Sequence, residues 1–325
     1  MMKLPRRAFL HLAAAAALPL SARKALAQAY PTRPVRLIVG YAAGGTADIV
    51  ARIIAQRLTE RLGQPVVVEN KPGATTNIAT QSVIGAAPDG HTLLYVTAAN
   101  ATNASLYSSL PFNFMRDIVP VAGLVEFTLV LVVNAALPVH SISEFVAYAK
   151  ANPGKINMAS FGVGSTSHLS GELLKLVTGI DTVHVPYRGG APMITDLVSG
   201  QVQAAFDALP ESLPHIRTGA LRPLAVTTAA RAESLPDVPT IGDTIPGYEA
   251  SSWAGLGAPR GTPPAVIETL RREAAAALAD PAIRTRLNDF GSAPWPLGPD
   301  AFGAYIAAET EKWAKVVKFA GVRAE

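Results

Sequence analysis

The sequence predicts an α/β protein of two lobes with a cleft between them. Strand-like and helix-like segments alternate twice along the chain, at 35–97 and at 156–227, which is typical of parallel sheets covered by helices. After an N-terminal leader about 300 residues remain, a length at which chains commonly divide into two domains. Apolar runs at 122–134 and 250–256 stand where the chain would cross to a second lobe and return.

The first strand–loop–helix unit contains the clearest candidate site. Residues 35–39 are almost all aliphatic, which predicts a buried strand, and apolar residues recur at helical spacing over 50–62. The loop between them, Gly40-Tyr41-Ala42-Ala43-Gly44-Gly45-Thr46-Ala47-Asp48, has few bulky side chains. Such a loop lets a ligand approach the backbone, and the helix start offers unpaired N–H groups to an anion.

Simpler interpretations of this loop stay open. Thr46 or Asp48 could be a helix cap that serves no ligand. The loop has neither the G-x-G-x-x-G spacing of a dinucleotide site nor the Lys-Ser/Thr pair of a P-loop.

The same logic continues along the chain. A strand at 91–97 leads into a small polar run, 97–103, which we expect to be a loop beyond the carboxyl end of the sheet, where α/β proteins bind ligands. In the second unit a strand at 156–160 leads into Gly162-Val163-Gly164-Ser165 and then a helix with a hydroxyl-bearing start. The other expected strands are 65–69, 182–186, 202–206 and 224–227, and the other expected helices are 77–86, 142–151, 193–200, 213–218, 264–278, 281–289 and 302–319.

Residues 1–27 read as an export signal and not as part of the fold. Lys3, Arg6 and Arg7 precede an apolar centre at 12–20, and small residues suitable for cleavage follow at 25–27. The Arg6-Arg7 pair resembles a twin-arginine signal, although ordinary secretion and cleavage two residues later also fit. The apolar centre is too short to span a membrane, so we expect a periplasmic protein released from its leader.

Charge and cysteine content exclude several functional classes. The chain has 28 Lys+Arg and 24 Asp+Glu; the leader holds five of the basic residues and none of the acidic ones, which leaves 23 against 24 and a net charge of −1. With no basic cluster we expect no nucleic-acid partner. Cysteine is absent, which excludes disulfides, a thiol nucleophile and a lipid-bearing cysteine.

With these segments in place, the chain resembles the Bug-type substrate-binding proteins of the tripartite tricarboxylate transporter family. The segments that carry the resemblance are Pro34–Val39, Ala43-Gly44-Gly45-x-x-Asp48, Val68–Ala74, Pro88–Leu94, Gly164–Leu169, Val185–Gly189 and Leu224–Thr227. The family commonly has phenylalanine where Tyr41 stands, and glycine where Thr75 or Thr76 follows Ala74.

The resemblance implies a two-lobed periplasmic-binding-protein fold of type II-like topology, with lobe 1 formed by 28–125 and 252–325 and lobe 2 by 126–251. It also implies a monomer without cofactor that binds a small mono- or dicarboxylate and works with integral membrane transporter subunits. The residues implied to contact the ligand are Tyr41, Ala42, Gly44, Gly45, Asp48, Thr97, Ala98, Ser160, Gly164, Ser165, Thr166, His168 and Asp207. Arg188 could assist, but on a polar loop it is more often a solvated residue.

Two other functions remain open at this point. Ser165, His168 and Asp207 could form the nucleophile, base and orienting acid of a hydrolase, although Ser165 also suits a helix cap and no G-x-S-x-G elbow exists. A receptor of this type could also present its ligand to a membrane kinase. The histidines are scattered without metal-site spacing, so we expect no metal. Because the resemblance is to a receptor and no nucleophile elbow is present, we also expect that the protein is not an enzyme.

Overall fold

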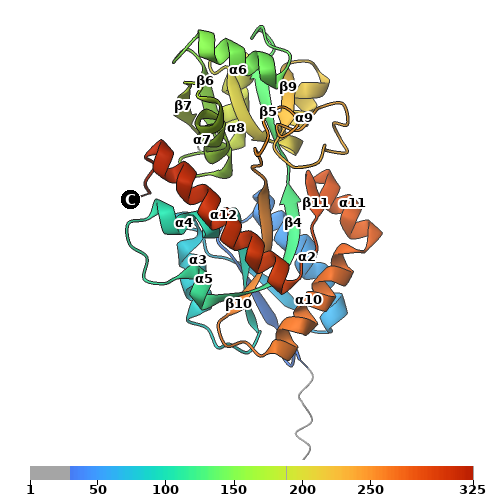
Figure 1. The fold of residues 1–325 in the computed structure, drawn as a ribbon. Coiled ribbons are helices and arrows are strands. Elements are labelled where there is room, and N and C mark those ends of the chain that lie inside the picture. Colours follow the sequence, from blue (N-terminus) through green and yellow to red (C-terminus); the bar gives the residue numbers. More distant parts are fainter. Residues whose placement is uncertain (1–29, 188, 325) are drawn as a thin grey trace, which may run out of the picture.

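A computed structural model describes residues 30–187 and 189–324, and the predicted leader lies outside them. The chain forms two sheets, each flanked by helices and set one above the other in Figure 1. Their strand orders are β11-β4-β10-β3-β1-β2 and β7-β6-β8-β5-β9. The prediction of an α/β protein with two lobes is confirmed. None of the described helices combines the length and apolarity needed to cross a membrane.

The first sheet is built from both ends of the described chain. Strands β1, β2 and β3 are parallel, and β10 lies antiparallel between β3 and β4. Its strands are β1 (Val35–Val39), β2 (Val66–Asn70), β3 (Thr92–Thr97), β4 (Ile118–Phe127), β10 (Ser252–Pro259) and β11 (Ser292–Pro294). The accompanying helices are α2 (Thr46–Leu62), α3 (Asn77–Ile84), α4 (Ala98–Leu106), α5 (Phe114–Asp117), α10 (Pro264–Leu278), α11 (Pro281–Asp289) and the 3₁₀ turn Ala74–Thr76.

The second sheet lies wholly within the middle of the chain. Strand β6 pairs in parallel with β7 and β8, whereas β5 pairs antiparallel with β8 and β9. Its strands are β5 (Leu129–Asn134), β6 (Asn157–Ser160), β7 (Val183–Pro186), β8 (Ala204–Ala208) and β9 (Leu221–Val226). Its helices are α6 (Ile142–Ala151), α7 (Thr166–Thr178), α8 (Gly190–Ser199) and α9 (Leu209–Arg217).

The apolar run at 122–134 does leave one sheet and enter the other, as predicted. It is two strands and not one, because Phe127 pairs with Ser252 in the first sheet and Leu129 pairs with Ala208 in the second. Only Thr128 separates them. The chain returns to the first sheet at Ser252, where β10 begins.

Helix α12 (Pro299–Ala320) contacts both lobes. Figure 1 shows it running obliquely from the first sheet towards α7. Phe302 and Ile306 belong to a core cluster of the first lobe, and Trp313 and Val316 belong to the main core cluster of the second. Besides the two chain crossings, this helix is therefore a third connection between the lobes.

One predicted loop is wrong. Residues 98–106 form α4, because Asn100 closes its first turn and small residues face the core. The backbone N–H of Thr97 donates to Asn100 Oδ1 over 2.8 Å, and Asn100 Nδ2 donates to Thr80 Oγ1 over 2.8 Å. Ala98 and Ala101 are buried, so a sequence that looks like a polar loop is held as a helix by tertiary contacts.

Candidate functional site

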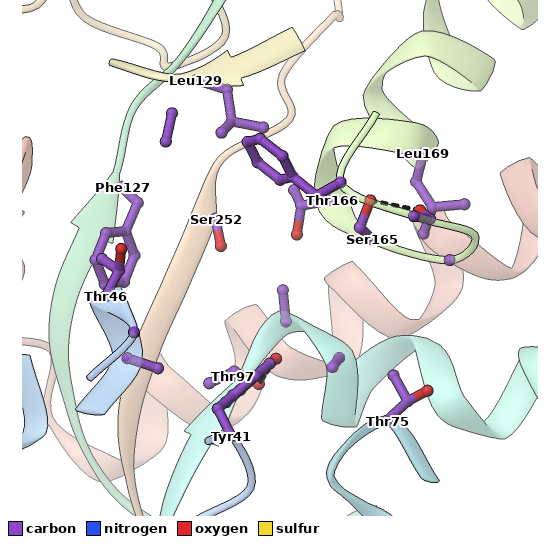
Figure 2. A pocket seen from close by; sticks show the side chains of 18 of the residues that line it. Tyr41, Thr46, Thr75, Thr97, Phe127, Leu129, Ser165, Thr166, Leu169 and Ser252 are labelled. Atoms are coloured by element: carbon purple, nitrogen blue, oxygen red, sulfur yellow. Dashed lines mark hydrogen bonds between the residues drawn. The ribbon is translucent and has the colours of Figure 1, made fainter. Parts of the chain in front are cut away.

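A cavity of about 460 Å³ lies between the lobes. Its walls include Tyr41 and Thr97 from the first lobe and Ser165 and Thr166 from the second, with Ser252 of the return crossing between them (Figure 2). A volume of this size suits a small organic ligand. Aromatic side chains supply much of the remaining wall, namely those of Tyr95, Phe127, Phe161, Trp253 and Trp313.

Four helix starts reach this cavity from both lobes. They are α2 at Thr46-Ala47, α4 at Ala98-Ala99, α7 at Ser165-Thr166 and α8 at Gly189-Gly190. The first backbone N–H groups of a helix have no partner within it, and the helix dipole makes that end positive. Helix starts that converge on one cavity favour an anionic ligand there.

Asp48 holds the first-lobe loop in place through a hydrogen bond to the loop backbone. Its carboxylate accepts hydrogen bonds from the Gly44 N–H over 2.9 Å, Asn70 Nδ2 over 2.9 Å and Arg52 Nε over 3.0 Å. Burial opposes ionisation of Asp48, but these hydrogen bonds outweigh it and lower the pKa to about 2. The residue at the helix cap is Gly45, and neither Thr46 nor Asp48 occupies that position. The Asp48 carboxylate thus holds the loop and lies outside the cavity wall.

The second-lobe loop is fixed by its own side chains. Ser165 caps α7, since its Oγ accepts the His168 N–H over 3.2 Å and donates to the Gly162 carbonyl over 2.7 Å. The Gly164 N–H donates to Nδ1 of the His168 imidazole over 3.0 Å. Gly162 and Gly164 have φ of +129° and +76°, which a residue with a side chain rarely adopts.

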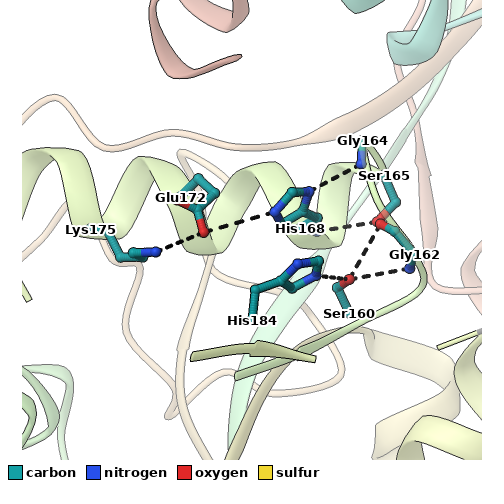
Figure 3. A network of polar contacts seen from close by, with 8 residues as sticks. All are labelled: Ser160, Gly162, Gly164, Ser165, His168, Glu172, Lys175 and His184. Atoms are coloured by element: carbon teal, nitrogen blue, oxygen red, sulfur yellow. Dashed lines mark hydrogen bonds and ion pairs between the residues drawn. The ribbon is translucent and has the colours of Figure 1, made fainter. Parts of the chain in front are cut away.

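A second histidine lies behind this loop. The rings of His168 and His184 are stacked with centroids 3.7 Å apart, and His184 Nε2 shares a 2.7 Å hydrogen bond with Ser160 Oγ (Figure 3). Burial, the neighbouring His184 and the charge of Lys175 lower the pKa of His168 to about 3. Burial and Lys175 also lower the pKa of His184. Both rings are therefore neutral near pH 7.

Asp207 is fully buried at the end of β8 and does not reach the cavity wall. Ser212 donates to one carboxyl oxygen, and the other has no hydrogen-bond partner among the described residues. Burial and the nearby Glu211 raise the pKa of Asp207 to about 7. Its neighbours Ala208 and Glu211 line the cavity instead.

The structure brings about half of the predicted ligand residues to the cavity. Those on the wall are Tyr41, Gly45, Thr97, Ala98, Gly164, Ser165 and Thr166. Those that do not line the cavity are Ala42, Gly44, Asp48, Ser160, His168 and Asp207. Arg188 lies outside the described residues.

Sequence reasoning missed several wall residues. Phe127, Ser252 and Trp253 stand at the two predicted crossings, and a cleft between two lobes has to be flanked by its crossings. That signal was available in the sequence. Trp313 lies far along the chain on α12, and nothing local indicates that it reaches the cleft.

The arrangement does not make a hydrolase triad. Ser165 Oγ accepts from the backbone of His168, and the His168 imidazole accepts from Gly164, so serine and imidazole are not paired as nucleophile and base. Ser160 and His184 are hydrogen-bonded, but Ser160 is 1% exposed and borders a void of only about 10 Å³. Within 30–187 and 189–324 no three potential metal ligands gather.

Comparison with known proteins identifies the family of the chain. Residues 50–322 match the family described as "Tripartite tricarboxylate transporter family receptor". The chain is 38% identical to "Protein BugT" of Bordetella pertussis, over 91% of this chain and 92% of that protein. It is 36% identical to a protein encoded in the tcbD-tcbE intergenic region of a Pseudomonas species, over 91% of this chain and 89% of that one.

Solved structures show the same fold. "R. palustris Rpa4515 with adipate" is 38% identical with a TM-score of 0.78, over 90% of this chain and 99% of that one. MatC from Rhodopseudomonas palustris, with bound malate, is 34% identical with a TM-score of 0.74, over 89% of this chain and 100% of that one. Periplasmic binding protein BugD is 35% identical with a TM-score of 0.75, over 91% and 100%. The chain therefore belongs to the tripartite tricarboxylate transporter receptors, a family of periplasmic solute-binding proteins.

Proposed function

We propose that this receptor is exported, captures a small mono- or dicarboxylate between its lobes, and delivers it unchanged to the membrane subunits of a tripartite tricarboxylate transporter. The observation that carries the proposal is the convergence of helix starts from both lobes on one cavity. Two similar proteins hold adipate and malate, which supports a carboxylate as the ligand class.

Backbone and hydroxyl donors suffice for such binding. Four hydrogen bonds to an ionised carboxylate contribute roughly 6–12 kcal/mol before ordering costs. A micromolar complex requires about 8.2 kcal/mol. Burial of the ligand's apolar part against Phe127, Phe161 and Trp253 adds to this.

Binding by lobe closure follows from where the donors lie. We assign lobe 1 to 28–125 and 252–325 and lobe 2 to 126–251, with hinges at the crossings near Thr128 and Ser251. A carboxylate that contacts helix starts of both lobes binds the closed arrangement more tightly than the open one. The ligand therefore shifts the receptor towards closure.

A thermal-shift screen of residues 28–325 tests the proposal. The compounds are di- and tricarboxylates, aromatic acids and acidic amino acids, with the matching amides as neutral controls. A ligand at about 100 times its dissociation constant should add about 2.7 kcal/mol of stability. We expect hits confined to the acids, with the compound recovered unchanged. Consumption of the compound, or equal hits among the amides, would contradict the proposal.

A cavity-filling variant tests the location. Thr166 points into the cavity from the start of α7 (Figure 2), so Thr166→Trp should abolish the shift while the protein stays folded. The matched control is Thr285→Trp, because Thr285 is exposed on α11 and does not line the cavity. Retained binding in Thr166→Trp would place the site elsewhere.

A further inference from the structure

The loop that carries the second-lobe donors is held from behind at two points. The Gly162 N–H donates to Ser160 Oγ over 3.2 Å, and Ser160 in turn is bonded to His184 (Figure 3). The Gly164 N–H donates to His168, whose ring stacks on that of His184. Two chains of contacts thus support the loop, one from the Gly162 N–H through Ser160 to His184 and one from the Gly164 N–H to His168. Both end in the same pair of stacked imidazoles.

This loop needs such support. Two of its residues are glycines, which lose more conformational freedom on ordering than any other residue. With the N–H groups of Gly162 and Gly164 bonded on the inner side, the N–H groups at the start of α7 remain for a ligand. A loop that is already ordered costs less on binding.

We infer that His168 and His184 are positioning residues of the receptor, which keep the Gly162–Ser165 loop in its binding conformation; the inference rests on the proposed function. Histidine suits the position because neutral imidazole offers an acceptor at Nδ1, with its proton on Nε2. Burial opposes a charge on either ring, and stacking at 3.7 Å disfavours a second one, although the Glu172 carboxylate lies 3.8 Å from His168 Nε2.

Amide exchange of the ligand-free protein tests this without reference to binding. In His168→Asn the side-chain carbonyl oxygen can replace Nδ1, so Gly164 should stay protected within about threefold of wild type. His168→Phe keeps the stacked ring but has no acceptor, and Gly164 should exchange at least about tenfold faster. Equal protection of Gly164 in both variants overturns the inference.

Binding gives the functional readout, with adipate and malate as probes. His168→Asn should bind like wild type, and His168→Phe at least about tenfold more weakly. If neither probe binds wild type, the amide exchange of Gly164 alone tests the role of the histidines. A failure of this inference can therefore be told apart from a failure of the proposed function. Should His168→Phe not fold, Ser160→Ala removes the other chain of contacts, and Gly162 should then lose its protection. Unchanged Gly162 protection there counts against the inference.

An independent observation concerns the charge of the cavity wall. Among the described wall residues Glu211 is the one with a charged side chain, and it stands in the first turn of α9. Its carboxylate lies against the start of α8, because a Cβ on Gly190 would come within 1.7 Å of Glu211 Oε2. An alanine at position 190 would therefore displace this carboxylate.

A carboxylate here affects which ligands fit. It accepts hydrogen bonds from N–H or O–H groups and repels a second anionic group of the ligand. Partial burial raises the pKa of Glu211 above its usual range, although part of the residue stays exposed to solvent. The helix starts of α2, α4 and α7 remain for the ligand's own carboxylate.

We propose that Glu211 is a specificity-determining residue that selects carboxylates whose far end carries an N–H or O–H donor and disfavours dicarboxylates. This narrows the ligand class of the proposed function and depends on it.

Matched linear acids of four to six carbons test the selection. Each length provides an unsubstituted acid, an ω-amino acid and a dicarboxylate, for example hexanoate, 6-aminohexanoate and adipate. Wild type should bind the best ω-amino acid at least about tenfold more tightly than the dicarboxylate of equal length. Glu211→Gln and Gly190→Ala should reduce this ratio to about threefold or less. The control is Glu233→Gln, because Glu233 is exposed and does not line the cavity.

Three outcomes overturn this selection. They are dicarboxylates that bind wild type as tightly as ω-amino acids, an unchanged ratio in Glu211→Gln, and no binding by any ω-amino acid of the series. If dicarboxylates bind wild type as tightly as ω-amino acids do, the proposed function stands and only the role of Glu211 is wrong.

Discussion

Two buried side chains of the second lobe, His168 and Asp207, respond to pH in opposite directions. The pKa of His168 is lowered from its usual 6.5 to about 3, so below pH 6.5 the unfolded chain binds a proton that the folded chain does not. The pKa of Asp207 is raised from 3.8 to about 7, so between these two pH values the folded chain holds a proton that the unfolded chain has lost. The first effect lowers stability as pH falls, and the second lowers it as pH rises.

Single variants should therefore separate the two effects between about pH 4 and 6.5. Each group contributes up to about 1.4 kcal/mol per pH unit to the free energy of unfolding. Relative to wild type, Asp207→Asn should become steadily more stable as pH rises, because the His168 effect is no longer offset. His168→Asn should become less stable over the same range. Urea unfolding at several pH values measures both slopes, and slopes of the same sign would contradict the assignment.

At the level of single residues the sequence indicates the wall loops better than the role of each side chain. Glycine-rich turns before helices located Gly45, Gly164 and Ser165, because those positions depend on local backbone chemistry. Whether Asp48, His168 or Asp207 faces the cavity depends on which neighbours donate hydrogen bonds to the carboxylates or stack on the imidazole. Those neighbours, Asn70, His184 and Ser212, come from other elements and carry no local signal.

At the level of elements, one carboxylate of α12 attaches this helix to β10 and also holds a buried indole of α12 itself. Glu309 Oε2 accepts from Trp253 Nε1 of β10 over 3.2 Å and from Trp313 Nε1 over 2.7 Å. Lys312 is paired with the same side chain, and both indoles are buried. The carboxylate thus satisfies two buried donors that have no other partner in the described hydrogen bonds.

Removing this acceptor should be costly. Glu309→Leu leaves two buried indole N–H groups unpaired, each costing about 1–3 kcal/mol. We expect a loss of about 2–5 kcal/mol in the free energy of unfolding. Glu309→Gln keeps one acceptor oxygen and should lose clearly less. Glu311→Leu on the exposed side of the same helix is the control. Urea unfolding followed by tryptophan fluorescence measures these losses, and equal values for Glu309→Leu and Glu311→Leu would refute this role.

The longer elements were largely predictable, whereas helix α4 and the short elements α5 and β11 were missed. Strands and long helices follow from hydrophobic periodicity, and glycine ends such as Gly63, Gly179 and Gly200 mark where helices stop. Helix α4 was missed because its residues are small and polar. Its stability comes from Asn100 and from contacts with Thr76 and Thr80, which periodicity cannot detect.

For the whole molecule, three connections limit how the lobes move. They are the crossing at Thr128, the return at Ser252 and the contacts of α12 with α4 and α7. Because these connections hold the lobes together, we expect one lobe to rotate against the other as in a hinge motion, and the lobes not to move apart.

Ligand binding should therefore make the receptor more compact while its secondary structure stays unchanged. Small-angle scattering, with and without a saturating acid from the screen, should show a smaller radius of gyration in the bound form. Far-UV circular dichroism should be the same in both. An unchanged radius upon saturation would exclude closure as the binding step.

The position of β10 also determines the order in which the lobes can be completed during synthesis. All five strands of the second sheet lie between residues 129 and 226. In the first sheet β10 pairs with β3 on one side and β4 on the other, so this sheet stays divided until residue 259 has been made. A nascent chain can therefore form every strand of its middle sheet before the sheet that begins the sequence is joined, whereas the core of the middle lobe is completed only when Trp313 and Val316 of α12 arrive.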